Sequence, residues 1–196
     1  TNNQELHQTK MMFNLIEKCG IKHNRNMPID ISLPADKIPY SQKKFVVLHL
    51  SDKWINSFYS EDNLLELISL FKEEKYSIML TTDKSTKKKF SKIYANFKII
   101  SNEDFGNIKL INNEILILDN LNYENWIKII YSSSRVITPE CGCTHVAAAC
   151  KVPVSIIYDS KNFPEAIHKE YAPWKTKYNK FIFGEKNINQ KLIKSI

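Results

Sequence analysis

The segment from Thr138 to Pro153 is the part of the sequence whose residue types and spacing most suggest chemistry. An apolar stretch leads to Glu140, a turn of small residues is centred on Gly142, and an Ala- and Val-rich helix is predicted directly afterwards. The first N–H groups of a helix have no acceptor within it, and the helix dipole adds ~0.3 to 1 kcal/mol for a nearby anion. His145 lies in the first turn and offers a further N–H donor. The pattern predicts a phosphate site.

Three other interpretations of this segment stay open from the residues alone. A glycine turn before an alanine-rich helix is common in α/β domains and needs no ligand. Side chains that could bind a metal are Cys141, Cys143, His145 and Cys150. Their spacings are tighter than in usual zinc knuckles, and no second ligand pair lies elsewhere in the sequence. Cys141 and His145 also have the spacing of a Cys–His nucleophile pair, but no orienting third group is evident.

The elements around this segment are short apolar runs that alternate with amphipathic stretches. We predict strands at 45–50, 76–82, 97–100, 114–118, 135–138, 152–158 and 181–183, and helices at 62–72, 85–95, 123–131, 144–151 and 187–195. This alternation implies βαβ units and a parallel sheet with helices on both faces, an α/β fold of Rossmann-like kind. Ligands of such sheets bind beyond the carboxyl ends of the strands, so chemistry is expected in the loops after Leu50, Thr82, Leu118 and Thr138.

The first 44 residues have a different pattern. Apolar residues at helical spacing predict a helix over 3–19, and Gly20 follows as a C-terminal stop. Three prolines among polar residues then predict an extended linker over 21–44. We therefore divide the chain into a helix (1–20), a linker (21–44) and one Rossmann-like domain (45–196).

Composition limits the classes of partner. The chain has 196 residues, 43% of them hydrophobic and 25% charged, as in an ordinary globular domain, and a net charge of +7 that favours an anionic partner. Only Arg25 and Arg135 are arginines, so guanidinium groups that could recognise bases through paired hydrogen bonds are scarce, and nucleic acid is disfavoured as a partner. The sequence has neither an apolar run of the ~20 residues that cross a bilayer nor a secretory signal pattern. We therefore expect a cytoplasmic protein with reduced cysteines.

Two motifs of this sequence resemble those of glycosyltransferase family 9, the lipopolysaccharide heptosyltransferases. The first runs Glu140-x-Gly142-x-x-His145-x-Ala147-x-Ala149 and closes with Pro153, and the second is the loop His49-Leu-Ser-Asp-Lys-Trp54 before a Leu-rich helix. The order and spacing of the intervening strands are similar too. The resemblance covers nearly the whole chain, as the C-terminal, nucleotide-sugar-binding half of such an enzyme.

The resemblance implies a donor site for a nucleotide sugar, typically ADP-heptose, with no other cofactor. By position, Lys53 contacts the donor diphosphate, the backbone that opens the alanine-rich helix cradles it, and Asp83 is aimed at the ribose. The donor-binding candidates are Ser51, Asp83, Glu140, Cys141, Gly142, Cys143, Thr144 and His145, and Lys53 and His145 are the catalytic candidates. Departures from the family pattern are Glu140 for Asp, Cys141 for Ser or Thr, an unusual Cys143, and Asp83 for Glu. No metal is implied, because the candidate loops hold no paired carboxylates.

The resemblance also implies partners. Such enzymes have a GT-B arrangement of two Rossmann-like domains, and the predicted first helix is similar to the element that joins them. The base for inverting transfer belongs to an N-terminal domain that these 196 residues do not contain. The segment alone is therefore expected to be inactive, and a basic surface suits an anionic lipopolysaccharide core acceptor with peripheral contact to the inner membrane. The alternative is a stand-alone basic α/β module that binds a nucleotide or nucleic acid without turnover.

Overall fold

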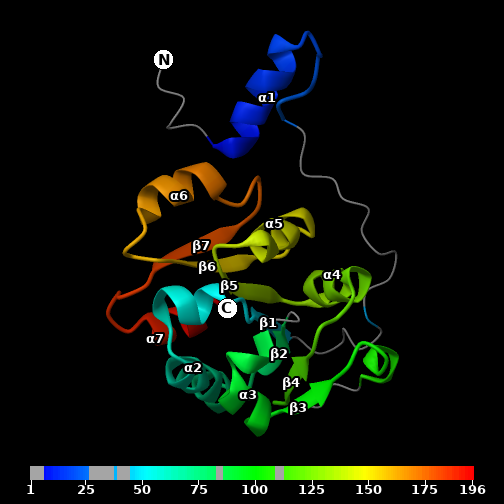
Figure 1. Cartoon of the computed structure of the whole chain (residues 1–196), viewed down its shortest axis with the longest axis vertical. Helices are drawn as coiled ribbons and strands as arrows, with labels where there is room; N and C mark the ends of the chain where they lie inside the picture. The colour runs from blue at the N-terminus through cyan, green and yellow to red at the C-terminus, as the bar shows by residue number, and fades with distance from the viewer. Residues whose placement is uncertain (1–6, 27–37, 39–44, 83–85, 109–112) are drawn as a thin grey trace.

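A parallel β-sheet of seven strands forms the centre of the molecule (Figure 1). The computed structural model describes residues 7–26, 38, 45–82, 86–108 and 113–196. The strands are β1 (Phe45–His49), β2 (Ser77–Thr81), β3 (Lys98–Ile100), β4 (Ile115–Leu118), β5 (Arg135–Pro139), β6 (Val154–Tyr158) and β7 (Tyr178–Ile182). Their order is β3-β4-β2-β1-β5-β6-β7, and every neighbouring pair is parallel. The predicted α/β, Rossmann-like fold is confirmed.

Helices cover both faces of the sheet because successive residues of a strand point to opposite faces. In β1, Val46 and Leu48 belong to one apolar cluster, while Phe45 and Val47 belong to the other. The first cluster packs against α2 (Glu61–Glu73), α3 (Ser91–Asn96) and α7 (Ile188–Lys194), and the second against α4 (Tyr123–Ser132), α5 (Gly142–Ala149) and α6 (Pro164–Tyr171). The core is therefore two layers of side chains with the sheet between them.

The strand order changes direction at β1, the middle strand. The chain runs outward from β1 through β2 on one side, and returns to place β5 on the other side, with Val46 paired to Arg135 and Leu48 to Ile137. At such a switch point the loops after the two strands diverge and leave a crevice at the carboxyl edge of the sheet. Here these are the loops that contain Lys53 and Glu140, so the topology brings the two sequence motifs together.

Local differences from the predicted elements have identifiable causes. The predicted helix 85–95 is divided into a 3₁₀ turn (Thr86–Lys88) and α3, because Phe90 between them is fully buried and has non-helical φ −121° and ψ 45°. Helix α6 was not predicted, although Pro164 in its first turn is a recognised start signal. Helix α5 begins at Gly142, two residues before the predicted start, so its first turn lies directly at the end of β5.

Helix α1 (Gln8–Lys18) lies apart from the sheet, beyond α5 and α6 (Figure 1). It is attached at its N-terminal end, where His7 Nε2 is 2.7 Å from the carbonyl oxygen of Ala172 and the His7 ring lies 4.9 Å from that of Trp174. Most of the predicted linker falls outside the described residues, and the joining role of α1 stays a prediction. Among the described residues, no helix combines the length and apolar character that crossing a bilayer needs.

Candidate functional site

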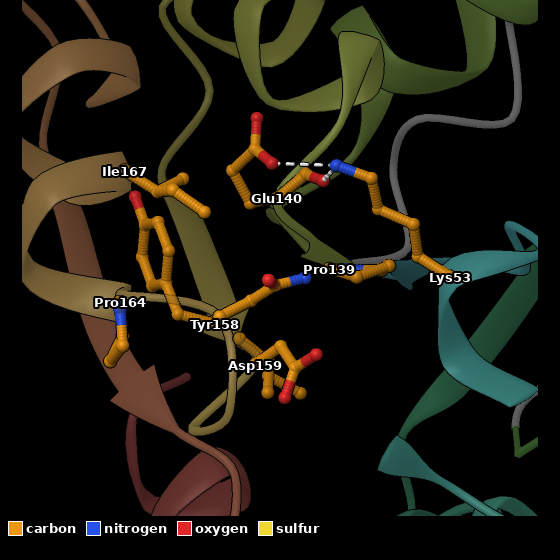
Figure 2. Close-up of a pocket in the computed structure, with 9 residues that line it drawn as sticks. Lys53, Pro139, Glu140, Tyr158, Asp159, Pro164 and Ile167 are labelled. Carbon is orange, nitrogen blue, oxygen red and sulfur yellow. Dashed lines mark hydrogen bonds and ion pairs between the residues drawn. The ribbon is translucent and has the colours of Figure 1, made fainter. Parts of the chain in front are cut away.

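An ion pair joins the two loops at the switch point. Lys53 Nζ donates to the Glu140 backbone oxygen at 2.5 Å and to its carboxylate oxygen Oε2 at 2.6 Å (Figure 2). The Lys53 side chain is 50% exposed and that of Glu140 is 17% exposed, so the ammonium group can meet a ligand from solvent. The two residues are 87 positions apart in the chain, and the topology of the sheet makes them neighbours.

Trp54 holds Lys53 in place. Its side chain is fully buried, and its indole Nε1 donates to the carbonyl oxygen of His49 at 2.7 Å, which closes the loop back onto the end of β1. A short π-helix (Trp54–Phe58) follows, and such turns are frequent at functional sites. In the same loop, Ser51 Oγ accepts from the backbone N–H of Lys53 at 3.2 Å. Lys53 therefore extends from a loop whose backbone is fixed by packing and hydrogen bonds.

Glu140 and the start of α5 are positioned by β5. The backbone N–H of Glu140 donates to Ile157 O at 3.1 Å, which continues the pairing of β5 with β6 beyond the last residue of the strand. Cys141 is the N-cap residue, with extended backbone at φ −167° and ψ −176°, and helical geometry begins at Gly142. Only two residues, Glu140 and Cys141, thus separate the strand from the helix. The first helical turn therefore begins two residues after Glu140, which binds the Lys53 ammonium, and the charge of Lys53 acts to lower the pKa of Cys141.

The first turn of α5 can hold an anion. By helix geometry the N–H of Gly142 has no acceptor within the helix, while that of Cys143 interacts with the Cys141 thiol and that of Thr144 donates to Cys141 O at 3.0 Å. These backbone donors, the positive end of the helix dipole and the Lys53 ammonium converge at the same edge of the sheet. The arrangement suits a phosphate or diphosphate group.

A large hollow of 450 Å³ adjoins this turn on the α4 side. The residues that line it are His49, Ser51, Thr82, Asn120, Leu121, Tyr123, Trp126, Cys141, Gly142 and Cys143. Its wall includes two tilted ring pairs: the Trp126 ring lies 5.6 Å from that of His49 and 6.0 Å from that of Tyr123. Tyr123 is 63% exposed. An aromatic wall beside an anion site has the shape and chemistry to bind a nucleoside.

A smaller hollow of 60 Å³ borders the ion pair (Figure 2). It is bounded by Lys53, Pro139, Glu140, Ile157, Tyr158, Asp159, Asn162, Pro164 and Ile167. Its polar residues are two carboxylates, an amide, a phenol and an ammonium. Tyr158 is 1% exposed, and its hydroxyl makes no hydrogen bond to any residue that the structure describes.

Burial determines the protonation of the thiols and the imidazole near the turn. Burial raises the pKa of Cys141, against hydrogen bonds from Thr138 and the Cys143 backbone and the charge of Lys53. It raises the pKa of the fully buried Cys143 far more. It lowers the pKa of His145, opposed by Glu140 and assisted by His7. At neutral pH these groups are thiols and a neutral imidazole, which gives no support to a Cys–His nucleophile pair.

The predicted site residues fall into four groups. Lys53 and Glu140 form the ion pair, and Ser51, Cys141, Gly142 and Cys143 line the large hollow. Thr144 is fully buried and lines neither hollow, so it can contribute only through its backbone. His145 also lines neither hollow, but the charge of Glu140 acts to raise its pKa. Asp83 lies outside the described residues. Within the described part of the chain, no three His, Cys, Asp or Glu side chains are grouped to hold a metal ion.

Sequence reasoning missed the aromatic wall. Trp126 is the fourth residue of α4, and neither Trp126 nor His49 was among the predicted site residues. A signal was present, because α4 follows the carboxyl end of β4 and its first turn must lie at the same edge of the sheet. At that edge the Asn120 N–H donates to Thr82 Oγ1 at 3.4 Å, and Asn120 has a positive φ of 49°.

Three solved structures show how this fold compares with known proteins. A glycosyltransferase family 9 protein from Veillonella parvula DSM 2008 has a TM-score of 0.68 at 12% identity, with 97% of this chain and 54% of that one covered. E. coli heptosyltransferase WaaC with ADP has a TM-score of 0.62 at 12% identity, with 92% and 52% covered. E. coli ADP-heptose lps heptosyltransferase II has a TM-score of 0.60 at 12% identity, with 89% and 54% covered.

These likenesses concern the fold, and the chain spans about half the length of the structures that it matches. Comparison with curated protein sequences gives no significant match. The family model described as "Glycosyltransferase family 9 (heptosyltransferase)" matches residues 8–194. Because that match takes in almost the whole chain, including both loops of the switch point, the chain belongs to glycosyltransferase family 9.

Proposed function

We propose that this chain is the donor-binding half of an inverting glycosyltransferase that moves heptose from ADP-heptose to a lipopolysaccharide core acceptor. The observation that carries the proposal is the Lys53–Glu140 ion pair directly before the first turn of α5, which itself lines an aromatic-walled hollow of 450 Å³. Family membership supports it, and heptosyltransferase WaaC of similar fold has been solved with ADP and with ADP-2-deoxy-2-fluoro heptose.

The donor fits the crevice in one direction. Its diphosphate lies against the N–H groups of Gly142 and Cys143 and within reach of Lys53. The nucleoside then extends into the large hollow, where Tyr123 and Trp126 offer ring faces for the base. The sugar extends to the opposite side, toward the small hollow that Lys53 and Glu140 border.

The chemistry follows from this placement. Breaking the bond between the sugar and the diphosphate leaves negative charge on the departing phosphate, and fixed donors aimed at that charge lower the barrier. Lys53 and the opening N–H groups of α5 are such donors, and His145 is a further candidate in the same turn. Inversion also needs a carboxylate base on the acceptor side. We place that base in a second, N-terminal domain of the GT-B type, to which α1 leads, so this chain alone binds donor without transferring it.

The acceptor side of the proposal depends on charge. A net charge of +7 favours an anionic acceptor such as the phosphorylated lipopolysaccharide core, met at the cytoplasmic face of the inner membrane by peripheral contact. The proposed donor, acceptor and second domain together make the chain part of a lipopolysaccharide-building transferase.

The test is calorimetric titration of the chain with ADP, and Lys53→Ala is the decisive variant. A charge-assisted hydrogen bond contributes ~1.5 to 3 kcal/mol, and since Lys53 is half exposed we expect the low end, a loss of about tenfold in affinity. Lys191→Ala is a matched control, because Lys191 is also 50% exposed and pairs with a glutamate, Glu185, at 2.7 Å. It should leave ADP affinity unchanged.

A second ligand separates the alternative function. Single-stranded RNA should bind weakly and with equal affinity to the parent chain and Lys53→Ala. Tight RNA binding with a steep salt dependence, together with ADP binding that ignores Lys53→Ala, would contradict the donor site and favour a nucleic-acid-binding module.

A further inference from the structure

The Glu140 carboxylate binds the same ammonium that the proposed donor site offers to a ligand phosphate. The Lys53 ammonium has three N–H donors, of which one meets the Glu140 backbone oxygen at 2.5 Å and a second meets its carboxylate at 2.6 Å. The first bond does not depend on the glutamate side chain, so it keeps the ammonium at the end of β5 when the carboxylate is displaced or neutral. The third donor is then available to a phosphate at the start of α5.

The charges around Glu140 are few. The titratable groups that interact with its charge include Cys141, His145, Tyr158 and Tyr171, and all four are neutral at pH 7. Burial raises the pKa values of Cys141 and Tyr158 and lowers that of His145. A hydrogen bond to Glu170 raises the pKa of Tyr171. Lys53 is the cation that contacts the carboxylate directly (Figure 2).

The small hollow beside the ion pair therefore has an acidic lining. Glu140 and Asp159 contribute two carboxylates, Lys53 contributes one ammonium, and the uncharged remainder consists of Asn162, Tyr158 and apolar residues. A neutral, hydroxyl-bearing group is compatible with this lining. An additional phosphate charge is not, because both Glu140 and Asp159 line this hollow and would repel it.

We propose that Glu140 is a specificity-determining residue that makes the site prefer a sugar ester of a nucleoside diphosphate over the free nucleoside diphosphate. This rests on the proposed donor-binding function. A sugar ester carries two negative charges on its diphosphate, whereas the free diphosphate gains a third when its terminal phosphate ionises with a pKa near ~6. The extra charge lies at the end of the diphosphate that meets Glu140. Repulsion there weakens product binding, so the donor displaces the product of the preceding reaction.

The experiment compares ADP with ADP-glucose as the sugar-ester probe, by calorimetry at pH 7.5. In Glu140→Gln, which keeps an oxygen for Lys53 and removes the charge, we expect ADP to bind about tenfold more tightly and ADP-glucose at most about threefold more tightly. The β-methyl ester of ADP lacks the third charge and the sugar, and it should follow ADP-glucose. Glu140→Asp keeps the charge and should keep the ratio of the two affinities within about threefold of the parent chain.

The matched control is Glu185→Gln. Glu185 is 32% exposed and pairs with Lys191 at 2.7 Å, so this variant removes the same charge from the same kind of ion pair away from the site. It should change neither affinity. Equal gains for ADP and ADP-glucose in Glu140→Gln, or no gain for ADP, would overturn the discrimination while leaving the donor site intact. Failure of both ligands to bind the parent chain would overturn the proposed function itself.

Discussion

Removing the Tyr123 ring tests whether the large hollow holds a nucleobase. Tyr123 is the first residue of α4, is 63% exposed and has its ring 6.0 Å from that of Trp126. Because most of the ring is already in solvent, Tyr123→Ala should change the free energy of unfolding by no more than ~0.5 kcal/mol. A change in ligand affinity can then be attributed to a lost contact with the ligand.

The magnitude follows from the position of each ring. Stacking of a base on an aromatic side chain contributes ~1 to 3 kcal/mol, and a ring at the exposed rim belongs at the low end. For Tyr123→Ala we therefore expect ~1 kcal/mol, or about fivefold weaker binding of ADP. Trp126 lies between Tyr123 and His49, 5.6 Å from the His49 ring, and is more enclosed. For Trp126→Ala we expect ~2 kcal/mol, or about 30-fold weaker binding.

The assay is paired calorimetric titration with ADP and with inorganic pyrophosphate, which has the anionic part and no base. Pyrophosphate affinity should be the same in the parent chain and in both variants. Tryptophan fluorescence gives an independent readout: ADP should quench the parent chain, and Trp126→Phe should remove most of that quenching while Trp54 and Trp174 remain. Leu15→Ala is the control, because its apolar side chain on α1 is 57% exposed and lies outside both hollows.

One result would refute the reasoning. If pyrophosphate binds as tightly as ADP and neither aromatic variant changes ADP affinity, the base does not lie on this wall. The hollow would then be a surface feature next to a plain anion site.

Two predictions concern stability. Tyr158→Phe removes a buried hydroxyl that has no hydrogen-bond partner among the described residues. Urea denaturation should therefore show an unfolding free energy that is unchanged or raised by up to about 1 kcal/mol. A decrease of more than about 1 kcal/mol in the unfolding free energy would mean that the hydroxyl is hydrogen-bonded in solution. Burial lowers the pKa of His145 below its ordinary value of 6.5, so the unfolded chain binds the proton more readily and the unfolding free energy should fall as the pH drops from 7.5 to 5.5. His145→Gln should reduce this slope without abolishing it, because burial also lowers the pKa of His168; an unchanged slope would contradict the assignment.

The fold could be predicted from local patterns because strands and helices differ in hydrophobic period. The all-buried β2 and the one-sided α2 were both evident, since a strand covered on two faces is continuously apolar and a surface helix is apolar on one face. The break at Phe90 and the helix at Pro164 were not, because the first depends on a side chain reaching the core and the second on a weak start signal. Tertiary packing outweighed local preference at Phe90, whereas at Pro164 a local signal was present and was missed.

The candidate site was predicted only in part. The turn at Gly142 was predicted from the residues themselves, because a glycine before an alanine-rich helix leaves free N–H groups for an anion, whereas Lys53 was predicted only from the family resemblance. The contact between Lys53 and Glu140 and the inclusion of Trp126 in the wall were not predicted. Both depend on which loops meet at the edge of the sheet.

The sequence by itself determined the elements, the residues that face the core and the turn that opens α5, because these depend on interactions among residues only a few positions apart. Only the tertiary structure decided that β5 lies beside β1, which brings residues 87 positions apart to within 2.6 Å and places the α4 rings beside the α5 turn. The physical reason is that strand order reflects the packing free energy of the whole core. No local sequence pattern reports the packing free energy of the whole core. The charged groups and aromatic rings of the site therefore meet their partners only when the sheet has formed.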